Sequence, residues 1–245
     1  ITMERNIDMK EVSDGKLYTS NDMVKADCGG CEGCSACCRG MGESIVLDPL
    51  DIHRLCCGLG TDFNGLMVDK IELQIVDSVI LPNLKMASGN TEACSFLNPE
   101  GRCSIHAFRP GICRLFPLGR FYENGSFKYF LQVHECPKPN KTKVKIKKWL
   151  DTPDLKRYET YICDWHYYLR DLKTRIEAHP EQMKGISMDV LQKFYLTPYD
   201  PTADFYTEFY ERLKNAKKQL TNAPGTDIII KQLKCMRIWR NWQTR

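Results

Sequence analysis

The sequence predicts an α+β protein with an irregular, cysteine-rich first half that contains short strands and a hairpin, followed by a helical extension. Most of the cysteines lie between residues 28 and 140. Segments rich in β-branched and aromatic residues, separated by turn signals, lie in the same half, and apolar residues recur at helical spacing further on. We therefore expect a cysteine-rich domain at 28–140, a helical region packing on it at 150–222, and a basic tail at 223–245.

The first expected helix begins after a polar lead-in. Residues 1–27 contain few apolar side chains and predict an extended chain. Asp48 followed by Pro49 is typical of a helix start, because aspartate accepts hydrogen bonds from the first backbone N–H groups and proline suits the first turn. Gly58 and Gly60 then predict the end of this helix.

Strands are expected in two places. Residues 71–86 are rich in Ile, Val and Leu and predict one or two strands broken at Pro82. Residues 118–133 give the clearest prediction, because Asn124-Gly125 lies between two aromatic arms. This dipeptide is typical of a type I′ turn, so the segment predicts a β-hairpin.

The second half predicts helices after a lysine-rich segment. Residues 138–148 carry six lysines and no acid, which indicates a solvated connector, with an anion site as the alternative. Apolar residues at alternating spacings of three and four predict a long amphipathic helix at 155–176, ended by His179-Pro180. A short helix capped by a serine is expected at 187–196, and a last helix from Asp200-Pro201 onward. The apolar stripe expected on the last helix is Phe205, Phe209, Leu213, Ala216 and Leu220.

Composition and charge exclude several classes of protein. With 42% apolar and 27% charged residues, the chain is not expected to be disordered. Its longest apolar runs are only a few residues, so no transmembrane segment is expected. The first residues lack the apolar core of a signal peptide, so we expect a cytoplasmic protein.

The net charge of +4 comes from residues 223–245, because the basic and acidic side chains before them balance. The body of the chain therefore carries no strong nucleic-acid signal. The tail adds Trp239 and Trp242 to its basic residues, a combination that suits an anionic membrane surface or nucleic acid. An ordinary terminal segment without a binding role is the alternative.

Cysteine is the outlier, with thirteen residues in 245. An odd number excludes a fully paired disulfide framework within one chain, and the expected compartment is reducing. Clustered thiols in such a compartment indicate metal binding or redox chemistry.

The first cysteine motif is Cys31-x2-Cys34-x2-Cys37-Cys38. Gaps of two residues let neighbouring thiolates reach one metal centre. Three cysteines at this spacing are typical of the start of a [4Fe–4S] ligand set, and pairs at this spacing are equally typical of a zinc site. The adjacent pair is expected to point to different corners or centres, with a vicinal disulfide as the alternative. Cys136 followed by proline favours iron–sulfur.

The second motif is Cys94-x8-Cys103-x9-Cys113, with Arg-Pro before its last cysteine and Phe-Pro after it. Here the sequence resembles the CxxCxxCC cysteine-cluster family (YkgJ-like zinc- or iron-chelating or iron–sulfur proteins) over about residues 31–136. One member type is the flagellin lysine N-methylase, so the resemblance allows protein modification as well as redox chemistry. It implies metal chelation by eight cysteines: Cys31, Cys34, Cys37, Cys38, Cys94, Cys103, Cys113 and Cys136.

The chain departs from the family pattern in three places. His106 stands where the family usually has tyrosine, and it is either a ligand or a ring packed beside the site. Cys28 extends the first run and is either an auxiliary ligand or a bystander. The third departure is an extra pair of adjacent cysteines, Cys56-Cys57, in the first expected helix. Four cysteines are interpreted as ordinary thiols: Cys56, Cys57, Cys163 and Cys235.

Arg109 and Arg114 flank the cluster cysteines and are the candidate cofactor-binding residues. Guanidinium groups offset the negative charge of a thiolate-bound metal; surface arginines paired with local acids are the alternative.

The sequence contains no nucleotide loop, nucleophile elbow or zinc-protease motif, so no catalytic residue is assigned. We therefore expect an iron–sulfur protein, with [4Fe–4S] favoured and zinc as the alternative. It would act as a redox or protein-modifying enzyme, or as a component of one, with a protein partner or substrate of unknown identity. A structural zinc-binding interaction module without catalysis is the alternative function.

Overall fold

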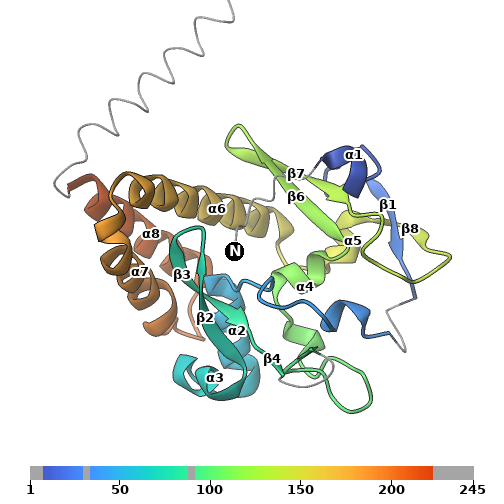
Figure 1. Cartoon of the computed structure of the whole chain (residues 1–245), viewed down its shortest axis with the longest axis horizontal. Helices are drawn as coiled ribbons and strands as arrows, with labels where there is room; N and C mark the ends of the chain where they lie inside the picture. The colour runs from blue at the N-terminus through green and yellow to red at the C-terminus, as the bar shows by residue number, and fades with distance from the viewer. Residues whose placement is uncertain (1–7, 30–33, 88–91, 223–245) are drawn as a thin grey trace, which may run out of the picture. The chain divides into compact units, whose positions relative to one another are not determined.

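The computed structural model describes residues 8–29, 34–87 and 92–222, which divide between Pro198 and Tyr199 into two compact units. The first unit combines helices with short antiparallel strand pairs, and the second contains a helix, which confirms the predicted α+β class (Figure 1). No helix in these ranges combines the length and apolarity needed to cross a membrane. The predicted domain boundaries at 28–140 and 150–222 stay a prediction.

All strands of the described residues occur as two-stranded antiparallel pairs. The pairs are β1 (Met23–Asp27) with β8 (Thr142–Lys145), β2 (Ile71–Val76) with β3 (Val79–Leu84), β4 (Met86–Ala87) with β5 (Ala93–Cys94), and β6 (Leu118–Glu123) with β7 (Ser126–Leu131).

The helices vary widely in length. They are α1 (Met9–Val12), α2 (Pro49–Leu59), α3 (Phe63–Asp69), α4 (Gly111–Leu115), α5 (Ile146–Leu150), α6 (Leu155–Ala178), α7 (Met183–Leu191) and α8 (Phe205–Asn222). Short 3-10 turns are η1 (Ala36–Cys38), η2 (His106–Phe108) and η3 (Pro180–Gln182), and a π turn, η4 (Gln192–Leu196), follows α7.

Helix α2 begins and ends where its sequence predicts. The Asp48 side chain accepts a hydrogen bond from Asp51 N at 2.9 Å, and the Asp51 side chain accepts one from Asp48 N at 3.2 Å. This reciprocal capping box, with Pro49 in the first turn, satisfies backbone donors that a helix start leaves open. Gly60 ends the helix in the left-handed conformation, at φ +64°.

The β6–β7 hairpin is confirmed, because Asn124 and Gly125 both have positive φ (52° and 76°), as a type I′ turn requires. The predicted break at Pro82 is wrong. Pro82 lies inside β3 opposite Leu73, and the chain turns at residues 77–78, which have φ of 46° and 68°. The Pro82 carbonyl accepts from Leu47 N at 2.9 Å, so it points away from β2. The carbonyl and the N–H of a strand residue point to the same side. The N–H that proline lacks would therefore also point away from β2, and its absence does not interrupt the β2–β3 ladder.

The structure also corrects the predicted lysine-rich connector, and the lead-in that was expected to be extended contains the short helix α1 as well as the strand β1. Residues 142–145 form β8, which pairs with β1 through Val24 and Val144. Ile146 follows and is fully buried. The lysines of this segment alternate with these apolar residues, so the same stretch buries one face and exposes the other. A core then forms from Val24, Ala26, Leu115, Leu118, Tyr129, Ile146 and Leu150.

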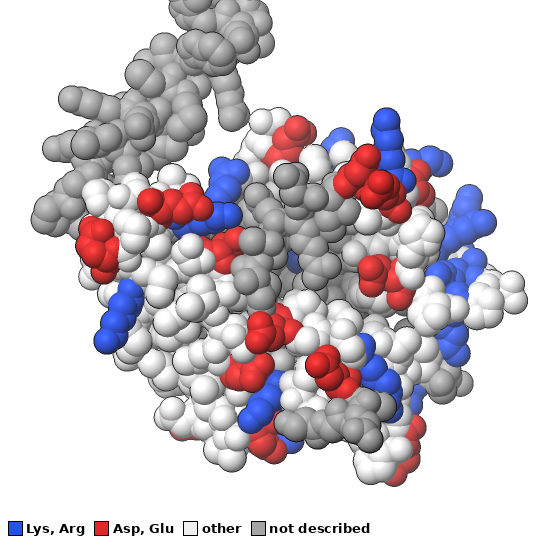
Figure 2. All heavy atoms as spheres, in the orientation of Figure 1, with Lys and Arg blue, Asp and Glu red and all other residues white. Residues whose placement is uncertain are grey.

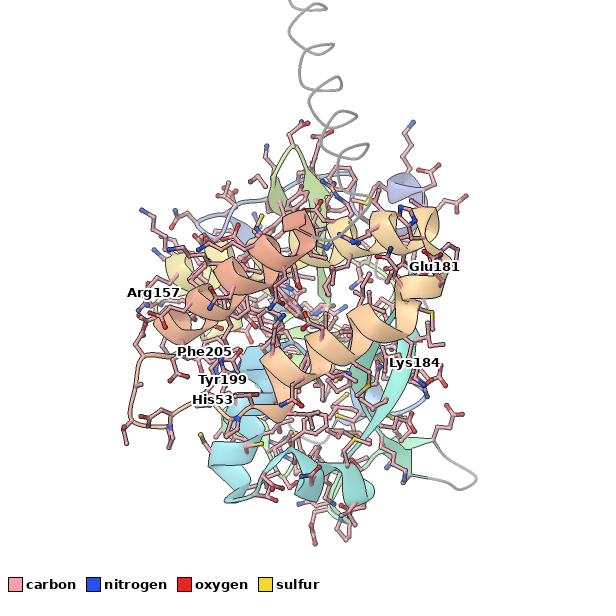
Figure 3. All side chains as sticks on the ribbon, turned by 90° about the vertical axis from the view of Figure 1, so that its left-hand side faces the viewer. His53, Arg157, Glu181, Lys184, Tyr199 and Phe205 are labelled. Atoms are coloured by element: carbon pink, nitrogen blue, oxygen red, sulfur yellow. The ribbon has the colours of Figure 1, made fainter. Side chains whose placement is uncertain are left out.

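Helix α6 confirms the predicted long amphipathic helix and ends just before His179. Arg157 near its start and Glu181 beyond its end lie on opposite sides of the view in Figure 3. The next helix does not begin at Ser187 as expected. Ser187 is fully buried inside α7, where its hydroxyl oxygen accepts from Ile80 N at 3.1 Å and joins α7 to β3. A serine with a tertiary partner is not available as a cap.

The second unit contains α8, whose start is later than Asp200. Asp204 accepts from Thr207 N at 2.9 Å and caps the first turn. Arg212 lies 3.7 Å from the centre of the Tyr199 ring. Four residues of the expected apolar stripe are buried: Phe205, Phe209, Leu213 and Ala216. The predicted basic tail, residues 223–245, lies outside the described residues.

Charged side chains of both signs are interspersed on the face shown in Figure 2. This agrees with the balance of basic and acidic residues before the tail.

Candidate metal centre

Short backbone contacts bring three cysteine-bearing segments together. Gly40 N, just after η1, donates to Glu92 O at 2.8 Å, and Arg39 forms a β-bridge with Ala93. A further bridge joins Leu97 to Cys103. The segments that carry η1, β5 and the following loop are therefore neighbours.

Five of the eight predicted ligand thiols lie within electrostatic range of one another: Cys37, Cys38, Cys94, Cys103 and Cys113. We call them the five-thiol group. A hydrogen bond between Cys37 and Cys38 raises the pKa of Cys37 and lowers the pKa of Cys38. Cys37 is exposed and the other four are partly buried.

Burial raises the pKa of three thiols of this group. It is the main cause that raises the pKa of Cys94 and Cys103, and the charges of neighbouring cysteines add to it. The pKa of Cys113 is raised first by burial and then by the Asp51 carboxylate and other cysteines. Thiolates this close repel one another, so a cation that replaces their protons would stabilise them.

Among the described residues, cationic side chains act electrostatically on the group. Arg109 lowers the pKa of Cys37, against the larger effects of the Cys38 hydrogen bond and of burial. It also lowers the pKa of Cys103, against the larger effect of burial, and Arg102 acts on Cys103 in the same way. Lys70 acts in the same way on Cys94. Arg109 is the predicted residue. Arg102 and Lys70 were not predicted from the sequence. Arg102 could have been found because it precedes Cys103 in the sequence, whereas no local pattern points to Lys70.

The other predicted arginine, Arg114, is engaged elsewhere. Its Nη1 donates to Asp151 O at 3.0 Å, and its Nη2 donates to Ala107 O. Its side chain is buried and joins α4 to the end of α5. A role for Arg114 in cofactor binding stays a prediction. His106, the unusual residue of the motif, contacts Arg109, with 2.8 Å between His106 Nδ1 and Arg109 Nη1.

Three predicted ligands are not members of the five-thiol group: Cys31, Cys34 and Cys136. Cys31 lies outside the described residues. Cys34 is partly buried three residues before Cys37. Cys136 follows β7, and its carbonyl accepts from Lys141 Nζ at 2.7 Å.

The cysteines interpreted as ordinary thiols have other neighbours. Cys57 Sγ lies 3.8 Å from Nδ1 of His53, which is labelled on α2 in Figure 3. Burial raises the pKa of Cys56 to about 11. Cys163 Sγ donates to Gly125 O at 3.4 Å. Cys235 lies outside the described residues.

The helix that carries Cys113 is held at both ends. At its start, Gly111 N donates to Asp51 Oδ1 at 2.8 Å. At its end, Trp149 Nε1 donates to Phe116 O at 3.1 Å. Asp51 was not a predicted site residue, because its partner lies 60 residues away in the sequence.

The donor set suits a soft metal. Within residues 8–29, 34–87 and 92–222, no three His, Cys, Asp or Glu side chains are arranged to hold a metal ion. The five-thiol group, whose members lie within electrostatic range of one another, nevertheless has the donor chemistry of zinc or iron–sulfur sites, whereas magnesium and calcium prefer oxygen. The residues present therefore fit the metals that the sequence predicts.

Comparisons with known proteins agree with this donor set. No curated protein and no solved structure is significantly similar to the chain. Residues 30–137 match the CxxCxxCC family, which is described as a "Putative zinc- or iron-chelating domain". All eight predicted ligand cysteines lie in the matched stretch. Over these residues, which are less than half of the chain, the sequence is similar to the CxxCxxCC family, and the family's description supports chelation of zinc or iron.

Proposed function

We propose that the cysteine cluster binds an iron–sulfur cluster, with [4Fe–4S] favoured, and that the protein is a redox or protein-modifying enzyme or a component of one. The observation that carries this proposal is the five-thiol group. Its thiols lie within electrostatic range of one another and are enough for the four thiolates that a [4Fe–4S] cluster takes. The motif at Cys31, Cys34 and Cys37 adds the ligand spacing of ferredoxin-type sites.

The protein's own residues would do three things at this centre. The cysteines supply thiolates once their protons leave, which the raised pKa values make unfavourable without a metal. Arg109, Arg102 and Lys70 offset the negative charge of the bound centre. Helix α4 places Cys113. An iron–sulfur cluster, when bound, supplies one-electron transfer or a Lewis-acid iron. The proposal includes a cytoplasmic location, where thiols stay reduced, and a protein partner or substrate.

A structural zinc module is the second candidate, and the shortness of the strand pair at the site favours it. The pair β4–β5 has two residues in each strand. Such a pair contributes little stability by itself, so a metal that joins these loops would stabilise the fold. Zinc has no redox chemistry, and this separates the two functions.

The experiment that tests the proposal is anaerobic purification from iron-replete cells, followed by assays of iron, zinc and acid-labile sulfide. We expect a brown protein that contains iron and sulfide and loses visible absorption on reduction with dithionite. The C163S variant is the matched control, because Cys163 lies outside the five-thiol group and should retain the metal. Protein that contains zinc but neither iron nor sulfide would overturn the iron–sulfur proposal and support the zinc module.

A further inference from the structure

Helix α4, which carries Cys113, has no cap of its own. It is only five residues long, and Pro110 at its N-cap position makes no side-chain hydrogen bond. A helix this short is not stable alone, and its first N–H groups need acceptors from elsewhere. The acceptor for Gly111 N is Asp51 Oδ1 on α2, at 2.8 Å. The two helices are far apart in the sequence (Figure 1).

The Asp51 side chain is held in place by contacts at the start of α2 as well as by its contact with α4. The residue is 2% exposed, and its second carboxylate oxygen accepts from Asp48 N at 3.2 Å. Asp48 in turn accepts from Asp51 N at 2.9 Å and from the Tyr161 hydroxyl at 3.0 Å. Both carboxylate oxygens of Asp51 are therefore engaged, and a buried carboxylate that lost these partners would be strongly disfavoured. The position of Asp51 defines where α4 begins.

The opposite side of α4 is equally restricted. A Cβ atom on Gly111 would lie 2.2 Å from the Tyr158 hydroxyl oxygen and 3.7 Å from Asp51 Oδ1. The Tyr158 hydroxyl is held by a hydrogen bond from Arg120 Nη2 at 3.0 Å. The start of α4 thus passes between a fixed carboxylate and a fixed phenol, and glycine is the residue that allows this approach.

We propose that Asp51 is a positioning residue of the metal centre. It holds the start of α4 and so directs the Cys113 thiol, two residues further on, toward the other four thiols. The inference rests on the proposed function, because it assigns Cys113 as a ligand. Residues that orient a ligand without touching the metal typically contribute about 10- to 100-fold to metal affinity.

The test uses D51A in the full chain, with D62A as the matched control. Asp62 also accepts from a helix N-terminal amide, Gly65 N at 2.8 Å, but it caps α3 and is exposed. Cobalt(II), added anaerobically to metal-free protein, is the probe, read through its thiolate charge-transfer absorption. Hydrogen exchange of residues 111–115 in the metal-free protein is the second readout. A third variant, D51N, keeps one oxygen that can accept from Gly111 N.

We expect D51A to weaken cobalt affinity about tenfold or more and to speed exchange in α4, while D62A changes neither. D51N should restore part of both. If D51A is insoluble, D51N is compared with the wild type, and wild-type cobalt affinity together with wild-type exchange in D51N would overturn the role. Unchanged affinity in a soluble D51A would overturn it too. If the wild type itself binds no cobalt through thiolates, the chelating function fails as well, so the two failures are distinguishable.

Discussion

The hydroxyl group of Tyr161 on α6 donates a hydrogen bond to Asp48, the N-cap of α2, and accepts one from Leu50 N, both at 3.0 Å. The two partners lie more than 110 residues before Tyr161. All three residues are buried. The start of α2, which carries Asp51, is therefore fastened to the long helix of the same unit.

The Y161F variant should be less stable than the wild type by about 1–3 kcal/mol, because it leaves Leu50 N without its acceptor and removes a donor from Asp48. Chemical denaturation measures the difference. Tyr167 gives a control: its hydroxyl donates to Ser126 O at 3.2 Å at an exposed position. A loss in Y161F no larger than that in Y167F would show that the buried hydrogen bonds contribute little.

The close approach at Gly111 predicts a pair of compensating substitutions. G111A should destabilise the protein by about 1–3 kcal/mol, because its Cβ would overlap the Tyr158 hydroxyl. Y158F removes that oxygen and leaves the nearest ring carbon at 3.3 Å. A double-mutant cycle should therefore give a favourable coupling of at least about 0.5 kcal/mol. Additive effects of the two substitutions would contradict the predicted contact.

Ligand and non-ligand cysteines should differ in their response to serine. We expect C113S and C94S to bind metal at least about tenfold more weakly and to become sensitive to protease, because metal binding is coupled to folding of the cysteine loops. C163S should match the wild type, since its thiol contacts Gly125 O outside the group. Metal analysis and limited proteolysis make the comparison. Equal tolerance of all three changes would remove the cysteines from the metal site.

Metal affinity should rise with pH. Burial raises the pKa of Cys94 and Cys103, so these thiols carry protons near neutral pH and must release them to bind metal. Each released proton contributes about a tenfold gain in affinity per pH unit below the thiol pKa. A site with ordinary thiols would level off above about pH 8.5, whereas this one should continue to gain. Competition titrations with zinc across this range measure the slope, and a flat profile would contradict thiol ligation.

Local signals predicted the elements that depend on near neighbours. Asp48-Pro49 and Asn124-Gly125 specify α2 and the β6–β7 turn, because caps and type I′ turns are formed within a few residues. The alternating three- and four-residue spacing predicted α6 for the same reason. The cysteine spacing predicted the family, which the match at residues 30–137 confirms.

The rest depends on contacts between distant residues. The tie from Asp51 to Gly111 and the position of Lys70 beside Cys94 leave no local pattern in the sequence. The lysines of 138–148 predicted a solvated connector, yet Val144 and Ile146 between them are the residues that pack. Pro82 predicted a break because proline lacks the N–H group that a strand can donate to its neighbour. Whether that N–H would have pointed toward β2 or away from it depends on the pairing of the strands, which the sequence does not show.

The outer edge of β3 is closed to a further strand. Ile80 N donates to the Ser187 hydroxyl oxygen at 3.1 Å, and Leu84 N donates to Ile45 O at 2.9 Å. Between them stands Pro82, which has no N–H to offer. Exposed strand edges recruit strands from other molecules and lead to aggregation. A buried serine, a proline and a short neighbouring segment therefore protect this hairpin from edge-to-edge association, and a serine-to-alanine change at 187 would open one amide of that edge.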